Sequence, residues 1–311
     1  MSFPLATLNE LMGLVPNASE HGVTIDHALE FCHWFMLALF LGWTAYFLYV
    51  IFRFHRTRHP KANYHGVKSK VSAHIEFSVI IIEAILLLGF AIPLWGKRVS
   101  EFPDKENALR VRATGEQFKW NFHYPGADNA FGRQKMELVS GANPLGLDAE
   151  DPAGLDDIVT NELGLVNYRP TVIEITSKDV IHSLSLHHMR MDQDAIPGVR
   201  IPMWFRPIRF GTYEIVCAQL CGGNHYSMRA EMSVKSQGDF DTWYKEFMSL
   251  QHPNAAPAAA PAAPGVSAAA PAPAAPGVPA AAPVPAVPSV PAAAPTAPAA
   301  APVATPTAPA K

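Results

Sequence analysis

The chain has 311 residues and a formal net charge of -3. Its basic residues do not form a stripe with interleaved aromatics, so the charge pattern gives no indication of a nucleic-acid partner. Three cysteines are too few for a disulfide framework, and the composition changes sharply from an apolar N-terminal part to an alanine- and proline-rich C-terminal part.

Two apolar runs in the N-terminal part predict a hairpin of transmembrane helices. Residues 29–52 carry no charge after Glu30, and at about 1.5 Å per residue the run exceeds the ~30 Å hydrocarbon core of a bilayer. Residues 77–96 are close to the minimum length and include Glu83, for which we favour packing against a partner subunit over a protonated side chain or a proton route. Two buried core helices are disfavoured, because nothing else in the chain could cover them.

The loop between the two runs predicts their orientation. Residues 53–76 are rich in lysine and arginine, whereas residues 1–28 contain neither. The basic residues of the loop are Arg53, Arg56, Arg58, Lys61, Lys68 and Lys70. By the positive-inside rule the loop is cytoplasmic, so that both termini and the block 105–250 lie on the periplasmic side of a bacterial inner membrane. The chain is thus expected to be a multi-pass membrane protein.

Residues 105–250 are expected to form one all-β domain. Apolar and polar residues alternate over 118–124 with the period of two of a half-buried strand. Further short runs of this kind, broken by Pro and Gly, indicate an antiparallel sandwich or barrel. A helix over 239–250, capped by Asp239, would close the domain. Residues 126–168 hold many acids and few strand signals, which predicts a long ordered excursion from the barrel.

The C-terminal residues 251–311 are almost entirely alanine and proline, with Lys311 as the only charge. They offer neither the bulk for a core nor enough amide hydrogens for regular structure. A disordered tail that serves as a spacer is expected.

The residues that carry chemistry lie between Cys217 and Met228. Cys217, Cys221, His225 and Met228 place two thiols, an imidazole and a thioether within one turn-sized loop. Soft sulfur donors with imidazole select copper over magnesium, calcium or manganese. A single-copper blue site leaves the second cysteine unexplained, whereas two cysteines four residues apart can bridge two copper ions. The second histidine must come from elsewhere, and His182, in a predicted strand, is well placed.

Each of these groups also has a plainer interpretation. A cysteine pair outside the cytoplasm is often a disulfide, and a Cys/His group can bind structural zinc. Met228 is an unusual zinc ligand, and the loop contains two adjacent glycines. The combination therefore favours copper.

At these residues the chain resembles subunit II of the haem-copper cytochrome c oxidases. The resemblance includes the two N-terminal spans, Asp-Val-Ile-His-Ser at 179–183, Asp-Ala-Ile-Pro-Gly at 194–198 and the loop 217–228. It implies a cupredoxin-like barrel with a binuclear CuA centre, in which both cysteines bridge the two copper ions. The remaining ligands that it implies are His182 with Met228 for one ion, and His225 with the backbone carbonyl of Gln219 for the other.

The resemblance also implies a function. The subunit would accept electrons from a cytochrome c-type donor and pass them to the haem of the catalytic subunit I, where oxygen reduction is coupled to proton pumping. Haem is expected only in that partner, other membrane subunits complete the oxidase, and no catalytic residue is expected in this chain. The alternatives are a membrane-anchored copper carrier or assembly protein without an oxidase partner, and a structural module with a disulfide. Ligands drawn from separated segments favour a permanent redox site.

Three further positions bear on how far the family's properties transfer. Gln219 replaces a glutamate whose carboxylate also binds magnesium, and because an amide is a weaker ligand for that hard cation, magnesium is not expected. Phe118 replaces the tryptophan at which electrons from cytochrome c enter, while Trp120 keeps the next aromatic position, so both are candidates for that route. Glu76 matches the glutamate at the cytoplasmic mouth of a proton channel, although an acid capping the first helical turn explains it equally well.

The electron donor is expected to be held at the membrane. The sequence contains no Cys-x-x-Cys-His motif of a fused cytochrome c, and it keeps the copper ligands that quinol-oxidising relatives have lost. With the tryptophan replaced and a long acidic excursion beside the copper domain, we expect a tethered cytochrome or a partner complex within a supercomplex to donate electrons, in place of a freely diffusing basic cytochrome.

Overall fold

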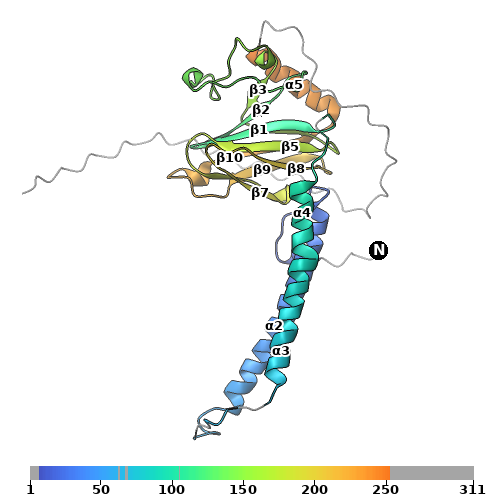
Figure 1. The fold of residues 1–311 in the computed structure, drawn as a ribbon, viewed down its shortest axis with the longest axis vertical. Helices are drawn as coiled ribbons and strands as arrows, with labels where there is room; N and C mark the ends of the chain where they lie inside the picture. The colour runs from blue at the N-terminus through green and yellow to red at the C-terminus, as the bar shows by residue number, and fades with distance from the viewer. Residues whose placement is uncertain (1–6, 62–63, 67–68, 105, 253–311) are drawn as a thin grey trace, which may run out of the picture. The chain divides into compact units, whose positions relative to one another are not determined.

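The computed structural model describes residues 7–61, 64–66, 69–104 and 106–252. A helical hairpin and a β domain make up this part of the chain (Figure 1). The short helix α1 (Leu8–Leu11) precedes the hairpin and begins with a capping box between Thr7 and Glu10. The predicted disordered tail, 251–311, lies outside the described residues from position 253 onward.

Two long helical runs form the hairpin. Helix α2 (Gly22–Arg53) is continuous, whereas the second run consists of α3 (Val71–Ile85), η1 (Leu86–Ala91) and α4 (Ile92–Ser100). The π-helical segment η1 lies just before Pro93, whose missing N–H and bulky ring favour a widened preceding turn. Both runs are long and apolar enough to cross a membrane.

Both helical runs extend beyond the predicted spans 29–52 and 77–96. The apolar pattern marks only the stretch that a bilayer would cover, while backbone hydrogen bonding continues into polar flanks that hold no helix breaker. Helix α3 has no acid in its first turn, so Glu76 lies inside the helix and the capping interpretation of Glu76 is wrong. No residue of α3 is buried, as expected of an apolar helix whose surface is covered by lipid or by other membrane subunits.

The β domain consists of two five-stranded sheets with the orders β3-β2-β1-β5-β8 and β4-β10-β9-β6-β7. Their strands are β1 (Leu109–Glu116), β2 (Lys119–Tyr124), β3 (Ile158–Thr160), β4 (Leu163–Val166), β5 (Thr171–Ser177), β6 (His182–Leu186), β7 (Met191–Ala195), β8 (Ile201–Phe205), β9 (Gly211–Cys217) and β10 (Arg229–Lys235). Most neighbours are antiparallel, but β1 pairs with β5 and β4 pairs with β10 in parallel. The expected antiparallel pairing therefore holds for most neighbours but not for these two pairs, whose strands are joined by long connections through other strands and not by hairpins.

Side chains from both sheets form one core. Trp120, Phe122 and Tyr124 are fully buried and belong to this core, which confirms that they form the core-facing side of the strand. The opposite face of β2 is not open to solvent as a half-buried strand would be, because His123 is fully buried as well. Local alternation identifies which residues face the core, but it carries no information about what covers the other face.

Helix α5 (Gln237–Gln251) closes the domain and packs Phe240 and Tyr244 into the core. The helix begins two residues earlier than predicted. Its N-cap is Ser236, whose Oγ accepts a hydrogen bond from the backbone N–H of Asp239, so the assignment of Asp239 as the cap is wrong.

Residues 126–157 cover the outer face of β2 and are called here the acidic excursion. They include the 3-10 turns η2 (Met136–Leu138) and η3 (Pro152–Gly154). The excursion is shorter than the predicted 126–168, because β3 and β4 occupy the last part of that range. Strands of three and four residues are too short to show a clear alternation in the sequence.

The acids of the excursion are tied to neighbouring groups. At its base the fully buried Asp157 accepts hydrogen bonds from His123 Nε2 at 2.6 Å, Gly126 N at 3.0 Å and Gly132 N at 2.7 Å. Asp148 is buried and forms ion pairs with the side chains of a lysine and an arginine, each at 2.8 Å. These partners are Lys135 and Arg133. Hydrogen bonding from Lys135 above all lowers the pKa of Asp148 to about 2.

Candidate metal centre

The segment 217–228, called here the copper loop, connects β9 to β10. Its ends are held together by the hydrogen bond from Cys217 N to Met228 O at 3.1 Å. Strand β6 lies next to β9 with Leu184 opposite Cys217, so that His182 falls beside the start of the loop. The 3-10 turn η5 (His225–Ser227) then brings the loop back towards β10. Sheet register thus places the distant histidine against the loop.

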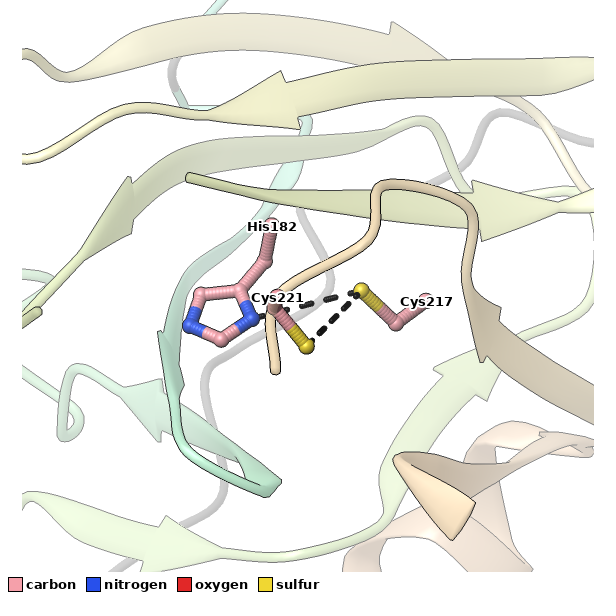
Figure 2. A group of neighbouring side chains, drawn as sticks. All are labelled: His182, Cys217 and Cys221. Atoms are coloured by element: carbon pink, nitrogen blue, oxygen red, sulfur yellow. Dashed lines mark hydrogen bonds between the residues drawn. The ribbon is translucent and has the colours of Figure 1, made fainter. Parts of the chain in front are cut away.

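The predicted side chains converge in this structure. Figure 2 shows His182, Cys217 and Cys221, whose ligand atoms all lie within 4.8 Å of one another. Cys217 Sγ lies 3.9 Å from Cys221 Sγ and 4.0 Å from His182 Nδ1. On the other side, Cys221 Sγ lies 3.6 Å from His225 Nδ1 and 3.8 Å from Met228 Sδ.

The sixth predicted donor is a backbone group. The carbonyl oxygen of Gln219 lies 3.2 Å from Cys217 Sγ, while the Gln219 residue as a whole is exposed. Both cysteines of the loop are free thiols, and their 3.9 Å separation is far from a bonded S–S distance of about 2.05 Å. The disulfide interpretation of this pair is therefore wrong.

Most of the donor set is shielded from water. His182 is fully buried, and Met228, Cys221 and Cys217 are 1%, 4% and 7% exposed. Burial, together with the adjacent Cys217 thiol, raises the pKa of Cys221 to about 11. The thiol therefore stays protonated at neutral pH without a metal, and a cation that binds there must displace the proton.

A hydrogen bond fixes the orientation of His182. Its Nε2 lies 2.8 Å from Asp179 Oδ1, which leaves Nδ1 directed at Cys217 Sγ. Because a carboxylate accepts, the proton of the neutral imidazole resides on Nε2 and the lone pair on Nδ1 is available to a metal. In the sequence, Asp179 was noted only as part of the motif at 179–183. Its position three residues before His182 is the signal that could have identified it as a partner of that histidine.

The donors fit copper. Two thiols, two imidazoles, a thioether and a carbonyl make a soft set that does not suit hard cations. Six donors exceed the four that a structural zinc ion uses, and a thioether is uncommon among zinc ligands. The two thiols stand at the centre of the set, each with further donors of its own.

The two candidate aromatic residues lie against this centre. The ring of Trp120, fully buried, makes an edge-to-face contact with His182 at a centroid distance of 6.0 Å. A Cβ atom added to Gly222 of the copper loop would lie 3.1 Å from the Phe118 ring, so Phe118 packs directly on the loop. Glu76, by contrast, is an exposed residue of α3 and belongs to the hairpin.

A mixed β-sandwich with a cysteine-, histidine- and methionine-bearing loop between its last two strands, preceded by two membrane-length helices, is a membrane-anchored cupredoxin-like protein. The family profile described as "Cytochrome C oxidase subunit II, periplasmic domain" matches residues 109–236. The alternative cytochrome c oxidase subunit 2 of Bradyrhizobium diazoefficiens is 32% identical over 246 residues, covering 77% of this chain and 87% of that protein.

Another curated relative and a solved structure are also similar to parts of this chain. Cytochrome c oxidase subunit 2 of Cereibacter sphaeroides is 26% identical over 247 residues, covering 75% of this chain and 79% of the relative. The crystal structure of the periplasmic domain of subunit II of cytochrome oxidase of Bradyrhizobium japonicum is 25% identical, with a TM-score of 0.36, and covers 48% of this chain and 97% of that one.

The chain belongs to the cytochrome c oxidase subunit II family. It is therefore a subunit of a terminal oxidase, which is an oxidoreductase complex. It is also a bacterial membrane protein with a periplasmic domain. The His182, Cys217 and Cys221 cluster is consistent with the copper centre of this family.

Proposed function

We propose that this subunit relays electrons from a cytochrome c-type donor, through a binuclear copper centre, to the haem of the catalytic subunit I, where oxygen reduction is coupled to proton pumping. The observation that carries the proposal is the convergence of two thiols, two imidazoles, a thioether and a carbonyl, with neighbouring donor atoms 3.2–4.0 Å apart. An exchangeable copper carrier is disfavoured, because these donors are mostly buried and lie on two strands and a closed loop.

In this proposal Cys217 and Cys221 would hold both ions. The other ligands would be His182 and Met228 for one ion, and His225 and the Gln219 carbonyl for the other. When bound, the copper pair supplies a one-electron carrier. The chain's own part is to fix the donor positions through β6, β9 and β10, to exclude water from them, and to keep the His182 proton on Nε2. Magnesium has no place in the proposal, because Gln219 offers only an exposed amide.

Electrons are proposed to enter through Phe118 and Trp120, which pack on the loop and on His182. Two acids of the excursion, Asp148 and Asp157, are buried and paired, so they are not available to steer a basic donor. This supports a tethered cytochrome or a partner complex as the donor.

The donor proposal is tested by measuring oxidase turnover against salt, first with a soluble basic cytochrome c and then with native membranes. Exposed charges are screened within a Debye length of about 8 Å at physiological salt, so steering of a soluble donor would weaken steeply as salt rises. We expect slow turnover with the soluble protein and fast, nearly salt-independent turnover in membranes. Salt-sensitive oxidation of the soluble protein at the full membrane rate would contradict the tethered donor.

The proposed orientation puts residues 53–70 in the cytoplasm and the copper domain in the periplasm. Glu76, which follows this loop inside α3, is then at the cytoplasmic end of the hairpin, where a proton channel would open. We expect a protease added to intact cells with permeabilised outer membranes to spare the 53–70 loop, and to cut it only after the inner membrane is opened. Cleavage of the loop before that step would show the opposite orientation.

A further inference from the structure

Asp179 joins the buried histidine of the centre to a different part of the domain. One carboxylate oxygen, Oδ1, accepts from His182 Nε2 at 2.8 Å. The other, Oδ2, accepts the backbone N–H of Gln117 at 2.7 Å. Gln117 lies in the turn between β1 and β2, so the carboxylate links this turn to the start of β6.

The side chain of Gln117 continues the connection to the copper loop. Its Nε2 donates a hydrogen bond to the backbone carbonyl of Cys221 at 2.6 Å. The next residue, Gly222, has φ +139, and a Cβ added there would lie 2.8 Å from Gln117 Nε2. The loop backbone and the turn are therefore in direct contact. Together these three hydrogen bonds link His182, Asp179, Gln117 and Cys221 in that order, and the four residues are called here the clamp.

We propose that Gln117 is a positioning residue of the copper centre, which holds Cys221 and its loop in the ligand arrangement before any metal binds. The inference rests on the proposed ligand set. The clamp connects the buried histidine of β6 to the second cysteine of the loop. These two residues do not share a strand, and the hydrogen bond between Cys217 and Met228 that closes the loop does not join them either. Because Phe118 follows Gln117 and packs on Gly222, the clamp also fixes the ring against the loop.

Gln117 is proposed to act as a hydrogen-bond donor. An isosteric substitution that removes only the donor separates this role from the space that the side chain fills. Gln117→Glu keeps the size and removes the N–H group, whereas Gln117→Ala removes the side chain. Gln117 is exposed, so neither change removes a core contact. Lys119→Ala is the matched control, because Lys119 is a neighbouring exposed side chain that forms an ion pair with Glu116 at 3.0 Å and does not take part in the clamp.

The first measurement is hydrogen–deuterium exchange of the full chain in detergent without copper. Backbone hydrogen bonds donated by His225, Ser227 and Met228 fold the loop, so their amides report its opening. Both Gln117 variants should speed exchange of these amides roughly three- to tenfold, which corresponds to the net contribution of one hydrogen bond to stability. Lys119→Ala should leave it unchanged.

The second measurement is the visible and electron-paramagnetic spectrum of the same proteins after copper loading. Both Gln117 variants should show a broadened or heterogeneous signal at an unchanged melting temperature, which a merely structural role would not produce. Unchanged exchange in both variants would overturn the proposal. An effect of Gln117→Ala alone would also overturn it, because it indicates that the side chain only fills space. An effect of Gln117→Glu alone would do the same, because it indicates repulsion by the new charge. Failure of the unmodified chain to bind copper would count against the proposed function only, because exchange is read on copper-free protein.

Discussion

The acidic excursion and the copper loop are both polar loops of the same β domain, but they treat their polar atoms differently. In the excursion each buried acid meets oppositely charged or hydrogen-bonding partners of its own, as Asp157 does with His123. In the copper loop, within the described part of the chain, the sulfur atoms of Cys217 and Cys221 contact other members of the same donor set.

A polar loop can contribute to stability or to ligand binding, depending on which partners its buried polar atoms meet. Buried groups that satisfy one another stabilise a fold and leave no bonding capacity for a ligand. Soft donors that converge mainly on one another retain that capacity, and their burial makes the site selective. The excursion should therefore matter for stability, and the loop for copper. Substitutions in the two regions should produce opposite patterns.

The largest expected effect is on copper binding. Cys217→Ser or Cys221→Ser removes one of the two thiols that the proposal shares between the ions, so copper should fall from two ions per chain to at most one, and the delocalised spectrum should disappear. The melting temperature of the copper-free protein should change little. Metal analysis and visible spectroscopy measure this. Cys32→Ser, a substitution in α2 away from the centre, is the control and should keep both ions.

The next effect is on stability alone. Asp157→Ala leaves three donors without their acceptor, and each buried donor left unpaired costs about 1–3 kcal/mol. A loss of about 3 kcal/mol should lower the melting temperature of the β domain by about 6–12 °C. Copper stoichiometry at low temperature should remain that of the unmodified chain. Glu150→Gln, at an exposed acid of the same excursion, should change neither quantity, and equal losses in both variants would mean that the excursion acts through net charge.

The smallest effect is a pH dependence in the excursion. The pKa of Asp148 is lowered to about 2 in the folded chain, against about 3.9 when unfolded, so its charge stabilises the fold fully above the unfolded value. This contribution is lost as pH falls through about 2, when the carboxylate becomes protonated in the folded chain as well. Asp148→Asn should therefore lower the melting temperature at pH 6, and the difference from the unmodified chain should shrink between pH ~4 and ~2. A pH-independent difference would assign the effect to packing.

The same comparison explains which features could be predicted from the sequence. The copper loop was recognisable because its thiols, imidazole and thioether lie close together in the chain and their chemistry is distinctive. The β2 strand was recognisable because alternation is a local property. The two hydrophobic spans were recognisable for the same reason.

What the sequence did not reveal depends on contacts between distant segments. His123 of β2, which precedes the excursion, donates a hydrogen bond to Asp157 at the excursion's other end. The parallel pairing of β1 with β5 and the bond from Gln117 to Cys221 likewise join residues that are far apart in the chain. Sequence periodicity contains no record of such pairings.

The central claim is that this chain holds two copper ions between two shared thiols. The direct measurement is metal analysis of the purified full chain combined with its electron-paramagnetic spectrum, since one copper nucleus splits the signal into four lines and two nuclei sharing an electron equally split it into seven. We expect two copper ions per chain and the seven-line pattern. One copper ion with a four-line pattern, or zinc with no signal, would contradict it.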